Sequence, residues 1–239
     1  MTPETRPEAN SETPAGGTLP SVSRRRLFKG AAGSTGVLLA VHAKTALGAG
    51  LCRSPSADNS GNASPRPNRG ITCSGGRSPG FWKVPQHFSN WSKAGATKPT
   101  FKPGIVVNEC ATGMQNLRLN SLATQGTLLI SIGFLGAPAN TGIWAVMAFP
   151  NEFSGGQLMR HLSAAWLNAG YFSGDAAKYP ITQKQVIDMW KATKDGGLYC
   201  PGTIGGCGTS GWTAEKVIMY ISGMYDINSG VEPDLCTPS

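Results

Sequence analysis

The sequence holds few of the side chains that most enzymes use for catalysis. Of its 239 residues, three are histidines and 13 are acidic, and after residue 48 only His87, His161 and ten acidic residues remain. It contains no His-Glu-x-x-His zinc motif and no phosphate-binding loop. These absences make a zinc peptidase or a P-loop nucleotidase an unfavoured interpretation. They favour a protein without catalysis of its own. No cofactor is predicted.

The cysteines also lack metal-binding spacing. The chain has no Cys-x-x-Cys and no His-x-x-x-His pair, so no metal site is predicted. An even number of cysteines in an exported chain indicates disulfides, and six cysteines allow 15 connectivities. The Pro/Gly-rich segment "PGTIGG" between the fourth and fifth favours a local bridge there. The six candidates are Cys52, Cys73, Cys110, Cys200, Cys207 and Cys236.

No long hydrophobic run is present near the N-terminus. The apolar stretch 30–41 has roughly 12 residues, whereas a helix needs about 20 to cross a bilayer. It follows three arginines, and the small residues 46–48 after it suit a cleavage site. Arg25 and Arg26, followed by Leu-Phe-Lys, are typical of a twin-arginine export signal, with an ordinary secretion signal as the alternative. We therefore expect residues 1–48 to be a signal with a disordered leader, the twin-arginine machinery to be a partner, and the mature protein to be periplasmic, cell-surface or extracellular.

The mature chain has two parts of different composition. Apolar residues are nearly absent from 49–70, which predicts a disordered linker, and 71–239 is expected to be the folded domain. Residues 49–150 carry a net charge of +7 and residues 151–239 a net charge of −2. The positive part would attract a polyanion, unless it is simply a solvated basic surface. No nucleic-acid motif accompanies the charge, so no nucleic-acid partner is predicted.

The hydrophobic periodicity predicts a mainly α fold. One helix is expected over 154–170, with Ser154 as N-cap and Gly170 as its stop; a second follows a Thr182/Gln185 capping box; a third starts at Thr213. The uncharged, apolar segment 126–149 is interrupted by turn residues at 136–142, which favours two short buried segments over a membrane span. We expect a single small domain of several short helices with long loops stapled by disulfides, and no stable transmembrane anchor.

The stretch "SPGFWKVPQHFSNW", residues 78–91, concentrates the candidate binding residues Trp82, Lys83, His87 and Trp91. Buried, its aromatic rings would plug a small core, and this is the interpretation we favour. Exposed, they would form a binding surface. His161, on the apolar face of the first predicted helix, is expected to be a hydrogen-bonded core residue, or to meet His87 near Asn168 and hold a metal or move a proton.

The same stretch resembles the opening of a family of modules, of unknown activity, found on exported bacterial proteins. The shared pattern is Cys73, then Gly80-Phe81-Trp82-Lys83, then His87 and Trp91; here three residues separate the lysine from the histidine, more than is usual in the family. The segments "LMRHLSAAWLNAGYF" and "YPITQKQVIDMW" resemble its later helical parts, so the likeness covers most of 73–192. The resemblance implies architecture and an exported location, not a chemistry.

The leading functional hypothesis is an exported cell-envelope or extracellular module with a structural or binding role. The alternative is a small exported hydrolase or a metal-loaded redox protein, which the export signal would also suit. A third hypothesis gives the module a cell-wall or glycan polymer as partner. Solvent-facing Trp82, Trp91 and Trp212 would then stack on sugar rings, and Lys83 and Arg77 would contact anionic groups.

Overall fold

The structure is a computed structural model, and it describes residues 54–59, 75–105, 117–173, 175–176, 178–202, 207 and 210–225. All of these belong to one compact unit, residues 42–239. The predicted export signal, with Arg25 and Arg26, lies outside the described residues, as do Cys52, Cys73, Cys110 and Cys236.

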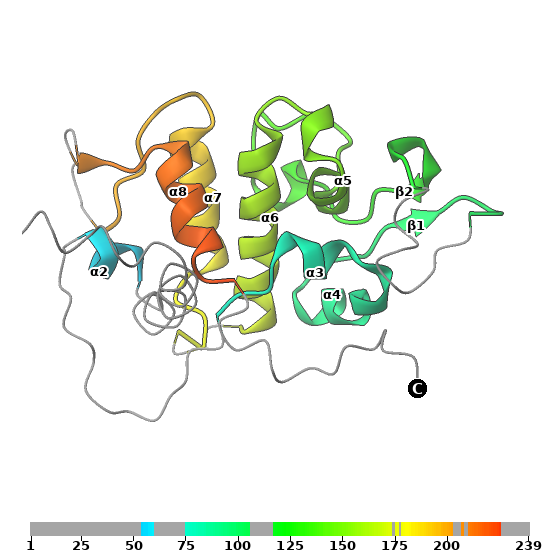
Figure 1. Ribbon diagram of the computed structural model, residues 1–239, viewed down its shortest axis with the longest axis horizontal. Helices are drawn as coiled ribbons and strands as arrows, with labels where there is room; N and C mark the ends of the chain where they lie inside the picture. The colour runs from blue at the N-terminus through cyan, green and yellow to red at the C-terminus, as the bar shows by residue number, and fades with distance from the viewer. Residues whose placement is uncertain are drawn as a thin grey trace, which may run out of the picture. The chain divides into compact units, whose positions relative to one another are not determined.

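The described residues form a mainly α fold, as the periodicity predicts. The long helix α6 lies in the middle, packed against α7 and α8 on one side and against α3, α4 and α5 on the other (Figure 1). The helices are α2 (Pro55–Asn59), α3 (Pro79–Lys83), α4 (Ser89–Lys93), α5 (Ile143–Ala148), α6 (Gly156–Tyr171), α7 (Gln183–Thr193) and α8 (Ala214–Ser222). Short 3₁₀ helices are η2 (Pro85–His87), η4 (Leu119–Ser121), η5 (Ile130–Ile132) and η6 (Pro150–Glu152).

The central helix differs from the prediction at both ends. Its N-cap is Gly155, with φ of 67°, and not Ser154; a left-handed conformation of this kind favours glycine. Gly156 then packs on the backbone of Pro150, where a Cβ would lie 1.8 Å from the carbonyl oxygen. At the other end Gly170 is inside the helix, which continues to Tyr171, and its backbone packs so close to Ala94 that a Cβ would lie 2.2 Å from the Ala94 carbonyl oxygen.

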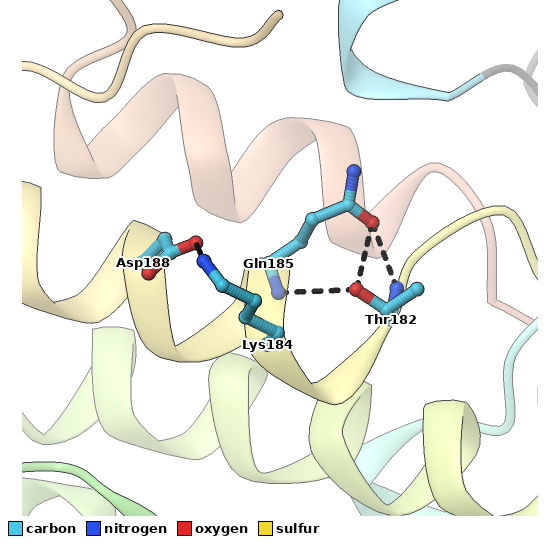
Figure 2. Close-up of polar contacts among 4 residues, drawn as sticks. All are labelled: Thr182, Lys184, Gln185 and Asp188. Carbon is cyan, nitrogen blue, oxygen red and sulfur yellow. Dashed lines mark hydrogen bonds and ion pairs between the residues drawn. The ribbon is translucent and has the colours of Figure 1, made fainter.

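The start of α7 confirms the predicted capping box, which Figure 2 shows. The Gln185 backbone N–H donates to Thr182 Oγ1 at 3.2 Å, and the Thr182 N–H donates to Gln185 Oε1 at 2.9 Å. On the exposed face of α7, Lys184 Nζ lies 2.6 Å from Oδ2 of Asp188, which is one helical turn further along. The cap satisfies donors that have no partner within the helix, so the chain enters α7 at a defined residue.

The third predicted helix is also confirmed. Thr213 is its N-cap and accepts a hydrogen bond from the Lys216 N–H at 3.3 Å. Val217 and Ile221 are fully buried. Tyr220 is buried as well and belongs to the same inward face.

The uncharged stretch before α6 forms part of the core. Ile143, Trp144 and Met147 of α5 are fully buried, and the turn before this helix contains Gly136 and Asn140 at positive φ. In the part of the chain that the structure describes, no helix is long and apolar enough to cross a membrane. The preference for two short buried segments over a membrane span is therefore confirmed.

Strand structure is limited to one small pair in the described residues. β1 (Thr100–Phe101) and β2 (Leu122–Thr124) are antiparallel, and Thr100 Oγ1 lies 2.8 Å from Thr124 Oγ1. Ile105, which follows β1 in the chain, is in a loop and 37% exposed.

Part of the expected disordered linker is ordered. Residues 55–59 form α2, and Asn59 Oδ1 accepts a hydrogen bond from the buried Trp212 Nε1–H at 3.2 Å. Asp58 Oδ2 lies 3.7 Å from Lys216 Nζ. The prediction of a disordered linker is therefore wrong for residues 55–59, because contacts with the α8 region compensate for the few apolar residues of the segment itself. The remainder of 49–70 lies outside the described residues, except Ser54.

The predicted local bridge between Cys200 and Cys207 is present as a disulfide. It closes the loop between Tyr199 and Trp212, whose backbones pair through two hydrogen bonds of 2.9 and 2.8 Å. Gly202 of this loop approaches Ser56 of α2 so closely that a Cβ would lie 2.6 Å from the Ser56 Cβ. The stapled loop therefore forms part of the surface on which α2 lies.

Candidate functional site

In the aromatic stretch 78–91, the two tryptophans belong to the hydrophobic core. Trp82 and Trp91 are fully buried. The Trp82 Nε1–H donates to Asn168 Oδ1 at 3.0 Å, and the Trp91 Nε1–H donates to the Trp82 carbonyl oxygen at 3.1 Å. Both indole N–H groups thus have partners inside the protein, as burial requires. We call residues 78–91 the aromatic plug.

Local sequence explains how the plug is shaped. Ser78 caps α3 by accepting a hydrogen bond from the Phe81 N–H at 3.4 Å, and Pro79 stands at the first helical position. Pro85 ends this helix and starts η2. The short helical pieces that result direct Trp82 and Trp91 inward while Lys83 and His87 remain half-buried at the edge.

Asn168 joins the plug to the central helix. Its Oδ1 accepts from the Trp82 Nε1–H and from the Arg77 backbone N–H at 2.8 Å, and its Nδ2 donates to the Arg77 carbonyl at 2.9 Å. Asn168 is itself fully buried. Gly76 lies so close that a Cβ would be 2.5 Å from Asn168 Nδ2, so this position needs glycine. The sequence places Asn168 only near a possible histidine pair, because an isolated asparagine gives no signal for a long-range contact.

Ser78 stands in a Gly-x-Ser-x-Gly sequence, residues 76–80, which has the spacing of the nucleophile elbow of hydrolases. That elbow holds its serine on a strained turn with an exposed hydroxyl. Here Ser78 has φ of −67° and ψ of 162°, an ordinary extended conformation, and its hydroxyl caps α3. The local geometry makes Ser78 a capping residue, and the motif does not favour a hydrolase.

His87 is part of the edge of the plug. Its ring stacks on Phe81 with 3.7 Å between centroids, and its Nε2 lies 3.1 Å from Gln86 Nε2. The Arg77 guanidinium lies 5.2 Å from the centroid of the same Phe81 ring. The Phe81 ring is therefore stacked on an imidazole and lies near a guanidinium cation.

His161 has a different set of partners. Its Nδ1 lies 3.0 Å from the Tyr225 hydroxyl, and the two rings stack with centroids 5.7 Å apart. Burial and, less strongly, the charge of Arg160 lower the pKa of His161 to about 4. His161 is hydrogen-bonded, as predicted, but it is half-buried and not a core residue.

Within the described ranges, no three His, Cys, Asp or Glu side chains gather into a group that could hold a metal ion. His87 and His161 instead lie against Phe81 and Tyr225 respectively. The alternative of a histidine pair that binds a metal therefore gains no support from the geometry.

A hydrogen bond holds the backbone of Lys83 in place, and the positive charge of Arg160 acts on its side chain. Its carbonyl accepts a hydrogen bond from the Trp144 Nε1–H at 2.8 Å. Burial and then the charge of Arg160 lower the pKa of Lys83. The Arg160 Nε is buried and has no hydrogen-bond partner in the described part of the protein. The charge of Arg160 therefore acts on Lys83 at the edge of the plug, whereas His161, with its lowered pKa, is neutral near pH 7.

The third hypothesis, which requires solvent-facing tryptophans, is wrong. Trp82 and Trp91 are in the core, and Trp212 is 2% exposed, with its ring against Tyr220 and its Nε1–H bound to Asn59. Large aromatic rings with an available internal partner are more stable buried than in water. Stacking of sugar rings on these three side chains is therefore excluded in the folded protein.

A separate cavity of about 360 Å³ lies between the end of α4, the end of α6 and the start of α7. Its lining includes Lys93, whose Nζ lies 4.0 Å from the centroid of the Tyr171 ring, and Gln183, whose amide donates to the Ala94 and Trp166 carbonyls. Lys93 and Gln183 of the lining thus make contacts inside the protein.

The lowered pKa of His161 predicts a pH dependence of stability. Between pH 6.5 and about 4 the unfolded chain binds a proton at His161 that the folded protein does not. The free energy of unfolding should therefore fall as the pH decreases through this window, by about 1–2 kcal/mol after allowance for solvent screening.

Denaturant unfolding of the wild type and of His161→Gln between pH 7 and 4 checks this. The glutamine variant should show a flatter profile, because it cannot take up that proton. Equal slopes in the wild type and His161→Gln would contradict the assignment.

Comparisons of the chain with protein-family models, with curated proteins and with solved structures find no match. The resemblance of residues 73–192 to a family of exported modules therefore stays a prediction.

Proposed function

We propose that this protein is an exported module of the cell envelope or extracellular space with a structural or binding role. The observation that carries the proposal is the Cys200–Cys207 disulfide. Disulfides form and persist mainly outside the cytoplasm. The Arg25-Arg26 sequence near the N-terminus supports the same location.

The aromatic plug limits which of its residues a binding role can use. Trp82 and Trp91 fill the core and have internal hydrogen-bond partners, whereas Lys83 and His87 are half-buried at the edge of the plug. A binding role of this stretch would therefore use its edge and not its tryptophans.

The test of the location is an export assay with the full-length chain. Replacing both Arg25 and Arg26 by lysine should leave most of the protein as precursor in the cytoplasm, because the twin-arginine machinery recognises that pair. Arg24→Lys is the matched control and should be exported normally. Cell fractionation and the size of the protein report the result.

The same assay in a strain without the twin-arginine machinery separates the two signal types. Unchanged export of the double lysine variant, or of the wild type in that strain, would overturn the proposed route. Metal analysis of the protein purified from the periplasm addresses the redox alternative, since a stoichiometric metal would argue against a module of structural or binding role alone.

A further inference from the structure

The short helix α2 depends on contacts with the start of α8, beside which it lies (Figure 1). Asn59 accepts a hydrogen bond from the Trp212 indole N–H at 3.2 Å. Asp58 Oδ2 lies 3.7 Å from Lys216 Nζ. The helix has five residues, of which only Pro55 is buried. An isolated helix shorter than about 12 residues is marginal in water, so α2 is formed only while it is docked.

The disulfide belongs to the surface on which α2 lies. Cys207 Sγ packs on Gly211, where a Cβ would lie 2.5 Å from the sulfur. Gly211 directly precedes Trp212 in the chain. Gly202, inside the bridged loop, packs on Ser56 of α2, with 2.6 Å between its Cβ position and the Ser56 Cβ. The bridge therefore affects α2 by two routes, through Trp212 and through the loop that it closes.

Loss of the bridge would free the loop but not the backbone pairing at its base. The disulfide joins two residues that are seven positions apart, and a bridge removes conformational entropy from the loop that it closes. The backbone hydrogen bonds between Tyr199 and Trp212 do not involve the sulfurs and would remain. Without the bridge, the loop conformation that places Gly202 on Ser56 would be one of many. Docking of α2 should therefore be weaker in the reduced protein.

We propose that the Cys200–Cys207 disulfide is a redox switch that fastens α2 to the start of α8. The S–S bond forms when the two thiols transfer two electrons and two protons to a disulfide-bearing oxidant, which becomes a dithiol. The reduced chain in the cytoplasm then presents residues 55–59 undocked, and oxidation after export docks them. The order of export and oxidation rests on the proposed function, whereas the coupling between the bridge and α2 does not.

The first experiment compares hydrogen exchange of the oxidised full-length chain with that of Cys200→Ala/Cys207→Ala, which lacks only this bridge. The amides of 56–59 include the Asp58 N–H, which donates to the Ser54 carbonyl at 3.0 Å. We expect these amides to exchange about tenfold faster or more in the variant, because local opening of α2 becomes more frequent. The amides of α7 are the internal control, and their unchanged rates would show that the variant is folded.

The second experiment tests the reverse effect and keeps both cysteines. Linkage is reciprocal, so a change that releases α2 must make the bridge easier to reduce, by up to the same factor. Asp58→Asn/Asn59→Ala removes two docking contacts. In dithiothreitol redox buffers, alkylation and mass spectrometry of the peptides that contain Cys200 and Cys207 should show a reduction midpoint shifted by about tenfold. Asp188→Asn, which removes an ion pair on the exposed face of α7, is the matched control and should keep the wild-type midpoint.

Equal exchange of residues 56–59 with and without the bridge, or an unchanged midpoint in Asp58→Asn/Asn59→Ala, would overturn the switch. If the variant without the bridge does not fold, the midpoint alone decides. The outcome is separable from that of the export assay. An exported protein without the coupling would overturn the switch and leave the proposed function standing, whereas coupling in a protein that stays in the cytoplasm would leave the switch standing and overturn the order of export and oxidation.

Discussion

Replacing Trp82 by alanine is expected to lower the free energy of unfolding by about 3–5 kcal/mol, as truncation of a large buried aromatic side chain does. Trp82 is fully buried, contacts Phe81 and Tyr171 edge to face, and pairs its indole N–H with Asn168. The variant loses this packing and leaves a cavity. The expected loss is a large part of the 5–15 kcal/mol by which a domain is typically stable.

His87→Ala is the matched control from the same stretch. His87 is half-buried, stacks on Phe81 and contacts Gln86, so its removal should cost about 1 kcal/mol. Urea unfolding of both variants gives the comparison. A Trp82→Ala variant with near-native stability would reverse the interpretation of the plug as core.

The second large effect is expected at Asn168. Alanine there removes the acceptor of the Trp82 and Arg77 N–H groups and the donor to the Arg77 carbonyl. Each buried polar group left without a partner costs about 1–3 kcal/mol, and some of them would be reached by water, so we expect a total loss of about 3–4 kcal/mol. The free energy of unfolding, measured in urea, checks the value.

The control for Asn168→Ala is Asn151→Ala. Asn151 is exposed, and its Oδ1 accepts one hydrogen bond from Gln157 Nε2 at 3.1 Å. A change of this kind at the surface is usually within about 0.5 kcal/mol. A loss of similar size for both variants would contradict a special role of Asn168.

The features that sequence predicts correctly are local ones. The caps of α7 and α8, at Thr182 and Thr213, depend on side chains that bond to backbone only three residues away. The Cys200–Cys207 bridge likewise joins neighbours in the chain. Such contacts are encoded by short spacings, so reading one segment at a time is enough to find them.

The features that sequence does not predict depend on distant partners. α2 is ordered by Trp212 and Lys216, and Gly155 rather than Ser154 caps α6 because the chain arrives from η6 in a left-handed turn. Nothing within either segment signals those neighbours. A short polar segment is therefore interpreted as a linker until its docking partner is known.

The candidate site also combines a local feature that the sequence predicts with long-range contacts that it does not predict. The aromatic plug is evident from composition, and the preference for burial over exposure follows from the size of its rings. Asn168 is separated from Trp82 by 86 residues, and the two residues come from different helices. Their proximity results from packing around α6, which spacing in the sequence does not encode.

The most direct test of the central claim, that the aromatic plug is fastened to α6 through Asn168, is a double-mutant cycle. Trp82→Phe removes the indole N–H, Asn168→Ala removes its acceptor, and urea unfolding of the two single variants and the double variant yields the coupling free energy. The 3.0 Å hydrogen bond between Trp82 Nε1 and Asn168 Oδ1 predicts a favourable coupling of about 1 kcal/mol or more. Strictly additive effects of the two substitutions would contradict the account.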